Sequence, residues 1–437
     1  MTTTIPEPRP AALSEAALEG DSGPWGARRF ERTVAILAVV LVALQRITVG
    51  PDLMPRHAVA IALLPVWLFA LREWRGARLL FGIGLVSVGA GLVLTLSAGA
   101  DLDVSTTAVL KQVNLVGGVI TGIGVILWTR RILGVRSVAL YFALGLLLNG
   151  LISVGALGAA NPFKFAFALP IAIGLLTLLS HRPRGLQLLV LLGLSGLASI
   201  SDARSLFGIC LAAAAVVAWQ MRPITSSRAG SWWSTAIVVA VIGGVLYNVV
   251  SALLVGGFLG AEAQQRSSAQ LGAAGSLILG GRPEIAATAA LMRMHPFGFG
   301  YGVSVGHSEL QAAKSGMAAI NYNPDNGYVE RYMFGNNVIE LHSVLGDLWA
   351  ASGLVGIALA LLMLWQVGRN ISQQIAARTA NGLVLFLAAL TAWNMFFSPL
   401  YSAAPSLILA FGLLLPDRLA ATAGAGNQRP ASTLAQP

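Results

Sequence analysis

Arg204 is the first residue whose type and setting indicate chemistry. It follows Ser201 and Asp202, either of which is a plausible N-cap for a helix over residues 204–220. The first turn of a helix attracts anions through its free N–H groups and its dipole, and a guanidinium adds directed donors. We therefore expect Arg204 to bind a phosphate group. The alternative is a local ion pair in which Asp202 neutralises the arginine.

Arg282 has a similar setting in a later part of the chain. It is preceded by two glycines and followed by Pro283 and Glu284, a pattern that predicts a helix from this point to about Met294. A guanidinium beside free backbone N–H groups makes a good phosphate ligand. We expect Arg282 to be a second anion ligand, and the alternative is a surface arginine on a loop helix.

His342 is the candidate for proton transfer, because an imidazole titrates near neutral pH. Asn336 or Asn337 is expected to cap a helix that begins just before it and continues as a span over 342–365. On that helix Glu340 and Asp347 would fall on other faces than the histidine. The alternative is a structural histidine. The residues expected to share its helical face are Val338, Gly346, Trp349 and Gly353.

Two weaker signals complete the set of candidate site residues. Lys111 lies near the outward end of a span expected over 108–128, where it is either a further pyrophosphate ligand or a lysine that extends to the interface. Gly298 and Gly300 belong to a glycine and aromatic turn over 295–302, which we interpret as close backbone approach at a substrate entrance.

The sequence gives no reason to expect a metal or an organic cofactor. Its histidines are spaced unlike any metal motif, and the single cysteine, Cys210, has no second cysteine to pair with in the chain. We therefore expect neither a metal site nor a cofactor. The histidines in question are His57, His181, His295, His307 and His342.

The composition defines the medium in which these residues work. Of 437 residues, 56% are hydrophobic and only 11% are charged, whereas soluble globular proteins carry about 25% charged residues. This balance excludes an ordinary cytosolic enzyme and a disordered chain, and it favours a protein that contacts membrane lipid. The net charge of +10 could suit a nucleic-acid partner. The placement of the basic residues explains the charge better, and we expect no nucleic-acid binding.

Apolar runs recur along the chain and predict an all-α polytopic membrane protein with about 12 transmembrane helices, since a span needs about 20 mostly apolar residues. Nine spans are expected within residues 33–254 and three within 342–416. The expected spans are 33–49, 57–71, 79–97, 108–128, 137–155, 165–180, 186–200, 204–220, 232–254, 342–365, 380–397 and 403–416.

Basic residues favour an orientation with both termini in the cytoplasm. Most of the 28 lysines and arginines fall in alternate short loops and in the two tails, as the positive-inside rule requires. We expect disordered cytoplasmic tails over 1–32 and 417–437. Residues 255–341 form a long outward-facing, partly helical loop, which we expect to be a small folded cap.

The candidate residues stand in an order that resembles the O-antigen ligase and polymerase superfamily. The shared pattern is an arginine before a helix at 281–284, a Pro-x-Gly-x-Gly turn at 296–300, and a histidine at 340–345 whose span carries Gly-x-x-Gly at 353–356. Residues 201–205 are similar to the Ser-x-Arg segment of that family. The resemblance covers about residues 195–400, and it departs from the family at Ser343, where an asparagine is more common.

The resemblance implies a glycosyltransferase at the outer face of the plasma membrane. Such an enzyme transfers a glycan from a polyprenyl-pyrophosphate carrier to a hydroxyl on a glycan or lipid-glycan acceptor, without a metal. In that reaction Arg204, Arg282 and Lys111 would bind the pyrophosphate and His342 would act on the acceptor hydroxyl.

Two other functions remain open from the sequence. A secondary transporter or flippase of a lipid-linked or anionic substrate would use the same arginines as substrate ligands. Its site would be expected near the middle of the membrane, whereas these charges lie at the outer edge. An envelope assembly scaffold would tolerate substitution of Arg204, Arg282 and His342.

Overall fold

The computed structural model describes residues 24–100, 102–153, 155, 158, 161–222, 232–258, 260–335 and 338–418. The described residues form helices connected by turns, with three isolated β-bridges and no strand. The chain is therefore all-α, as the sequence predicts. The first helix begins at Pro24, so the expected tail over 1–32 is too long by several residues. The helix extends beyond the apolar run because alanine, arginine and glutamate propagate a helix well.

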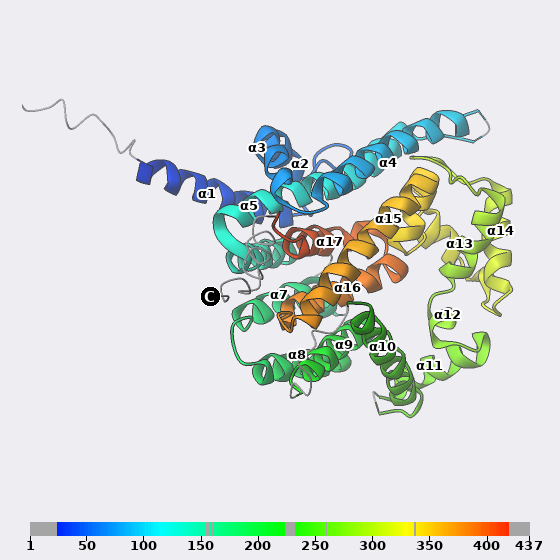
Figure 1. Ribbon diagram of the computed structural model, residues 1–437. Coiled ribbons are helices and arrows are strands. Elements are labelled where there is room, and N and C mark those ends of the chain that lie inside the picture. Colours follow the sequence, from blue (N-terminus) through cyan, green and yellow to red (C-terminus); the bar gives the residue numbers. More distant parts are fainter. Residues whose placement is uncertain are drawn as a thin grey trace, which may run out of the picture.

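The residues up to Val255 supply the first part of a helical bundle (Figure 1). These elements are α1 (Pro24–Ala43), α2 (Pro55–Ala62), α3 (Leu64–Ala70), η1 (Leu71–Glu73), α4 (Ala77–Ala98), α5 (Thr106–Ile152), η2 (Phe163–Phe167), α7 (Ala168–Leu178), α8 (Arg184–Ile200), α9 (Arg204–Gln220) and α10 (Trp232–Val255).

The second half supplies a group of short helices and then returns to the bundle. The short elements are α11 (Ala261–Ala274), α12 (Leu277–Gly281), α13 (Glu284–Met294), α14 (His307–Ala318), η3 (Pro324–Asn326) and η4 (Val329–Met333). The returning helices are α15 (Val344–Ala376), α16 (Gly382–Phe397) and α17 (Leu400–Leu414).

Four described helices are long and apolar enough to cross a membrane, namely α4, α5, the 235–255 part of α10, and α15. A fifth span results if α2 and the α3–η1 segment, which meet at 78°, form one broken span. Each of the twelve segments expected from the sequence contains a helix, but several of these helices have only 10–17 residues. The number of twelve spans stays a prediction.

Helix α5 covers two of the expected spans in one run of 47 residues. It is interrupted at Gly134, whose φ of 76° and ψ of 163° are not helical. Such a conformation is accessible to glycine and strained for other residues. The expected loop between 108–128 and 137–155 is therefore a sharp break at one glycine.

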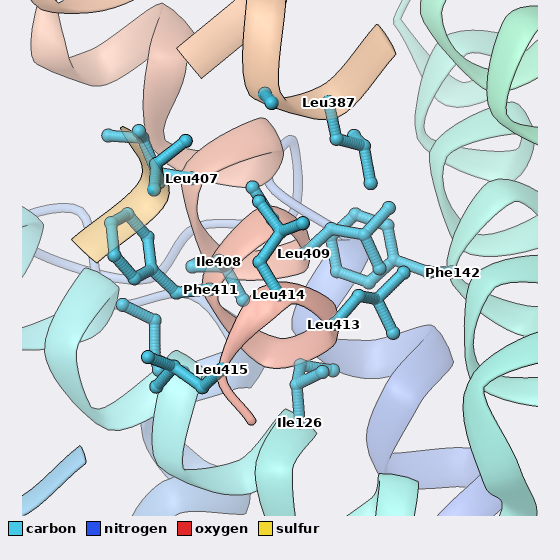
Figure 2. Packing of buried hydrophobic residues seen from close by; sticks show 14 of the residues in the cluster. Ile126, Phe142, Leu387, Leu407, Ile408, Leu409, Phe411, Leu413, Leu414 and Leu415 are labelled. Atoms are coloured by element: carbon cyan, nitrogen blue, oxygen red, sulfur yellow. The ribbon is translucent and has the colours of Figure 1, made fainter. Parts of the chain in front are cut away.

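Helix α17 forms the centre of the bundle. Figure 2 shows its leucines and Ile408 packed against Ile126 and Phe142 of α5 and Leu387 of α16. Its last carbonyls would be unsatisfied in this apolar setting. Arg130 of α5 donates from Nη1 to the carbonyls of Gly412 and Leu415, at 3.1 and 2.8 Å, and so caps the helix.

Large apolar side chains also cover the outside of the bundle. On α4, Val93 and Leu96 are 65% and 82% exposed, and on α10, Ile237 and Val241 are about as open. Soluble proteins rarely expose apolar side chains in such continuous stretches. These helices are compatible with a membrane protein whose outer surface contacts lipid.

The elements from α11 to η4 form a cap along one side of the bundle, on the right in Figure 1. The cap has its own apolar core, which includes Leu291 of α13 and Met317 of α14 and also takes in Trp349 at the start of α15. The expectation of a partly helical folded loop over 255–341 is met within the described residues. Because Trp349 belongs to this core, the cap and α15 pack as one structure.

The joint between cap and bundle lies at a break in α15. Gly353 has φ 62° and ψ −141°, so the helical hydrogen bonds are interrupted there. The carbonyl of Ala350 instead accepts the N–H groups of Phe299 and Gly300, at 2.8 and 3.0 Å. Main-chain bonds therefore fix the 295–302 turn against the bundle.

Candidate functional site

Arg282 and His342 come together around one tyrosine of the cap. The rings of Tyr328 and His342 have centroids 6.2 Å apart. The Tyr328 hydroxyl donates to the buried carboxylate of Glu284. Burial raises the pKa of Tyr328 and Glu284 raises it further, while Arg282 is close enough to oppose the shift. The two residues that the sequence singled out thus share a neighbour, although they are 60 positions apart.

Arg282 lies just before α13, close to the predicted position. The helix begins at Glu284 with Pro283 as its N-cap, so proline precedes the helix and does not occupy its first position. The two glycines before Arg282 belong to the short helix α12. The arginine is half-buried, so its guanidinium remains available to a ligand.

His342 does not lie on a helix, and this prediction was wrong. Helix α15 begins two residues later, at Val344, because the Ser343 hydroxyl accepts the N–H of Gly346 at 2.9 Å and caps the helix. His342 itself has a left-handed φ of 52°. The residues expected to cap the helix, Asn336 and Asn337, lie outside the described residues. The histidine therefore shares no helical face with Gly346 or the later glycines.

Asp347 fixes the segment that carries His342. Its Oδ1 accepts the N–H of Leu341, and its Oδ2 accepts the N–H of Leu400 at the start of α17, both at 2.7 Å. The carboxylate is nearly buried. The sequence placed Asp347 on another face from the histidine and gave it no role. The signal was an acid in the first turn of an apolar helix, where it is costly unless it has partners.

A cavity of about 230 Å³ opens beside this segment. It is bounded by the loop between α1 and α2, the start of α2, the start of α5, the segment before α15 and the start of α17. Glu340, two residues before His342, lines it and is close enough for His342 to affect its pKa, whereas Arg282, Tyr328 and His342 are not among the lining residues. The polar side chains used below are those of Asp52, Arg56, Lys111, Gln112, Glu340 and Tyr401.

Lys111 lies at the rim of this cavity. Its Nζ is 3.8 Å from Asp52 Oδ2, and both side chains are about 40% exposed. An ion pair this open contributes little stability. The predicted ligand is therefore positioned at a polar cavity, and its ammonium is free to contact a second anion.

Arg56 is the residue that sequence reasoning missed. It is 1% exposed, and none of its three guanidinium nitrogens has a hydrogen-bond partner within the described part of the chain. No carboxylate there forms an ion pair with it. The only signal in the sequence was an arginine directly after Pro55, at the start of an apolar run, and such a residue is usually an interfacial arginine.

Arg204 lies in a separate cluster at the α8–α9 turn. Asp202 has a left-handed φ of 48°, and its carboxylate lies 3.9 Å from Arg204 Nε, 3.9 Å from Lys164 Nζ and 3.4 Å from Arg266 Nη1. The N-cap of α9 is Ala203, which contradicts the expectation of Ser201 or Asp202. The reason is that the Asp202 carboxylate contacts three cations and not the helix end.

The cluster around Asp202 lies at the same end of the bundle as the cap, because Arg266 belongs to α11. Among the described residues, however, no hydrogen bond or ion pair connects it to Arg282, Tyr328 or His342. The structure thus brings Arg282 and His342 together at Tyr328, places Lys111 at the cavity, and leaves Arg204 with its own partners. The role of Arg204 as a pyrophosphate ligand stays a prediction.

Gly298 and Gly300 are packed tightly against the bundle. A Cβ at Gly298 would lie 2.4 Å from the carbonyl oxygen of Trp349, and one at Gly300 would lie 2.4 Å from the nitrogen of Thr95. Both glycines have a positive φ. The close approach expected at these positions is present and attaches the cap to α4 and α15. Their place at a substrate entrance stays a prediction.

The described residues contain no group of three His, Cys, Asp or Glu side chains arranged to hold a metal. The chemistry on offer is that of guanidinium and ammonium groups that bind oxyanions, and of an imidazole beside a tyrosine and two carboxylates. Comparisons of the chain with protein-family models, with curated proteins and with solved structures gave no match. A functional proposal for the chain therefore rests on the geometry of these residues.

Proposed function

We propose that the chain is an integral membrane glycosyltransferase that transfers a glycan from a polyprenyl-pyrophosphate carrier to an acceptor hydroxyl. The observation that carries the proposal is the meeting of Arg282 and His342 around Tyr328 in the cap of an apolar helical bundle; a polar cavity lined by Glu340 lies at the same end of the bundle. A lipid-linked donor requires these two parts together, since its tail dissolves in the bilayer and its pyrophosphate stays at the edge.

The reaction assigns a distinct task to each residue. The acceptor oxygen forms a bond to the anomeric carbon of the glycan, and the bond from that carbon to the pyrophosphate oxygen breaks, with its electron pair leaving on the pyrophosphate. Arg282 stabilises the negative charge that develops there. His342 accepts the proton of the attacking hydroxyl. Both residues are half-buried, so substrate reaches them and water is partly excluded.

The proposed orientation follows from the basic loops. If both termini are cytoplasmic, the cap and the site lie on the outer side of the plasma membrane. Arg130 and Arg131 lie just before the Gly134 break in α5, at the opposite end from Lys111 of the part of the helix that precedes the break, as the positive-inside rule requires of a cytoplasmic turn. A polyprenyl-linked glycan on the outer leaflet would reach the site from the lipid.

The test is a transfer assay with the purified full-length protein in proteoliposomes that contain a polyprenyl-pyrophosphate-linked glycan and an acceptor. We expect Arg282→Ala and His342→Ala each to lower the transfer rate by roughly 100-fold or more, the usual effect of removing a charge-stabilising group or a general base. Arg293→Ala is the matched control, because Arg293 is an exposed arginine on the same helix α13. Undiminished transfer by the first two variants contradicts the proposal.

A transporter or flippase is the second candidate, and one observation favours it. Helices α2 and α3 meet at 78°, and α2 carries the buried Arg56 in its first turn, at the other end from the break. Discontinuous helices are typical of transporter sites. Proteoliposomes distinguish the two functions: counterflow of a lipid-linked or anionic substrate without covalent transfer would establish transport in place of glycosyl transfer.

A further inference from the structure

The guanidinium of Arg56 lacks the partners that a buried charge requires. It is 1% exposed and its Nε, Nη1 and Nη2 donate to no described atom. Arginine remains protonated in proteins, so neutralisation by proton loss does not relieve the cost. An unpaired buried ion costs several kcal/mol, and structures keep one where a ligand completes it.

The space beside Arg56 has room for that ligand. Arg56 lines the cavity of about 230 Å³ together with Lys111, Gln112 and Tyr401. Lys111 at the rim adds a second positive charge that is only loosely held by Asp52. Arg56, whose guanidinium nitrogens are buried, borders the cavity and the Lys111 ammonium lies at its opening, and two such cations suit an oxyanion with several oxygens.

The neighbouring backbone holds Arg56 in place and leaves it space. His57 accepts the N–H of Met54 at Nδ1, at 2.9 Å, so its proton lies on Nε2, which donates to the carbonyl of Asn114 at 2.8 Å. Across from it, a Cβ at Gly118 would lie 2.6 Å from Arg56 Nε. The start of α2 is thus fixed to α5, and a glycine on α5 accommodates the guanidinium.

The acidic groups of the cavity leave Arg56 unneutralised. Asp52 lies with Lys111, and Glu340 lines the cavity without an ion pair to either cation. Burial raises the pKa of Glu340, against the opposing effect of His342, so its protonated form persists to higher pH than in a free glutamate. A ligand anion therefore meets little competition for Arg56.

We propose that this cavity is a binding subsite for a phosphate-class oxyanion, with Arg56 as the buried ligand and Lys111 at the rim. The identification of that oxyanion with the pyrophosphate of a lipid-linked donor rests on the proposed function. The anion site itself does not, because binding is measured without any transfer.

The test measures binding of inorganic pyrophosphate to the full-length protein in detergent, by titration and by thermal unfolding. Replacement of Arg56 by methionine keeps much of its volume and removes the charge. We expect Arg56→Met to raise the Kd by about 10-fold or more, the worth of charge-assisted hydrogen bonds, and to leave Tm unchanged or higher. Arg46→Met, an exposed arginine of the preceding loop, is the control and is expected to change neither quantity.

A Kd for Arg56→Met within about twofold of the wild-type value would overturn the subsite. If the Tm of that variant is also several degrees lower, Arg56 has a structural role. If Arg56→Met does not fold, Arg56→Lys provides the answer. Lysine keeps the charge but loses the planar fork, so we expect weaker pyrophosphate binding, and unchanged affinity contradicts the proposal.

A second arm identifies the source of the anion. Farnesyl pyrophosphate is compared with inorganic pyrophosphate at equal concentration in the wild type and Arg56→Met. Tighter Arg56-dependent binding of the farnesyl compound assigns the subsite to a lipid-linked group, and equal binding assigns it to a soluble phosphate. If the wild type binds pyrophosphate through Arg56 but transfers no glycan, the subsite stands and the glycosyltransferase proposal fails.

Discussion

Two groups of charged side chains lie at the cap end of the bundle, and they hold charge in opposite ways. At the α8–α9 turn, the half-exposed Asp202 contacts three cations, Lys164, Arg204 and Arg266. Beside α2, the fully buried Arg56 contacts no acid at all within the described chain. The first group is exposed and satisfied by its own residues, whereas the second is buried and incomplete.

The difference separates charged groups that are paired within the protein from a charged group for which we propose a ligand. Exposed ion pairs contribute about 0–1 kcal/mol and are easily rearranged. A buried unpaired charge is costly, so a fold that retains one gains something other than stability. The number of cations is therefore a poor guide to anion binding. The α8–α9 turn has more cations, but the buried, unpaired guanidinium among the described residues is at the cavity.

The largest expected effect concerns a buried carboxylate that does have its partners. Asp347→Ala removes both acceptors for the N–H groups of Leu341 and Leu400. We expect it to lower the free energy of unfolding by about 3 kcal/mol or more, at roughly 1.5–3 kcal/mol for each bond to a charged group. Denaturant unfolding in detergent measures the loss. Asp325→Ala, at a carboxylate that is 79% exposed, should cost under about 1 kcal/mol; equal losses would contradict the argument.

The second prediction supplies Arg56 with the acid that it lacks. Leu115 lines the cavity, and Leu115→Glu would place a carboxylate there. We expect pyrophosphate binding to weaken by roughly 30-fold, because the new acid neutralises Arg56 as Asp202 neutralises its neighbours. Leu115→Gln has the same shape without the charge and is expected to bind nearly as tightly as the wild type. Similar weakening in both variants would show that bulk, not charge, is responsible.

The smallest effect is the reverse experiment at the turn. Asp202→Asn removes the shared acid from three cations, and we expect a stability change below about 1 kcal/mol. Freed cations attract anions, so pyrophosphate binding should tighten by about threefold at low salt and not at high salt. Glu262→Gln is the control, since Glu262 pairs with Arg266 alone and is 78% exposed. Tightening that persists at high salt would exclude the electrostatic explanation.

The helices were predictable from the sequence because long apolar runs leave a chain few alternatives in lipid. Their breaks were not. Gly134 and Gly353 look like many other glycines in apolar runs, and only the packing around them decides which adopt a positive φ. The start of α15 was predicted wrongly for a related reason. Asparagine and serine are comparable N-caps, and the sequence does not show which of them the backbone uses.

The candidate site was predictable in its charged residues and not in its cavity. Arg282 and His342 were identified from local patterns; Arg282 lies just before its helix as expected, whereas His342 lies in the turn before α15 and not on the helix. The cavity is built from five segments spread between Thr48 and Tyr401, so no local pattern contains it. Arg56 was missed because only its burial distinguishes it from an interfacial arginine, and burial is a property of the fold.

The break in α15 restricts how the cap can move relative to the bundle. The two N–H groups that bind the Ala350 carbonyl are consecutive main-chain donors, so the cap cannot slide along α15 without losing both at once. One position of the cap along α15 is therefore favoured over all intermediate positions. Asp347 of the same helix binds the Leu341 N–H, so the segment that brings Glu340 to the cavity is anchored to α15 as well, on the same side of the Gly353 break as Ala350.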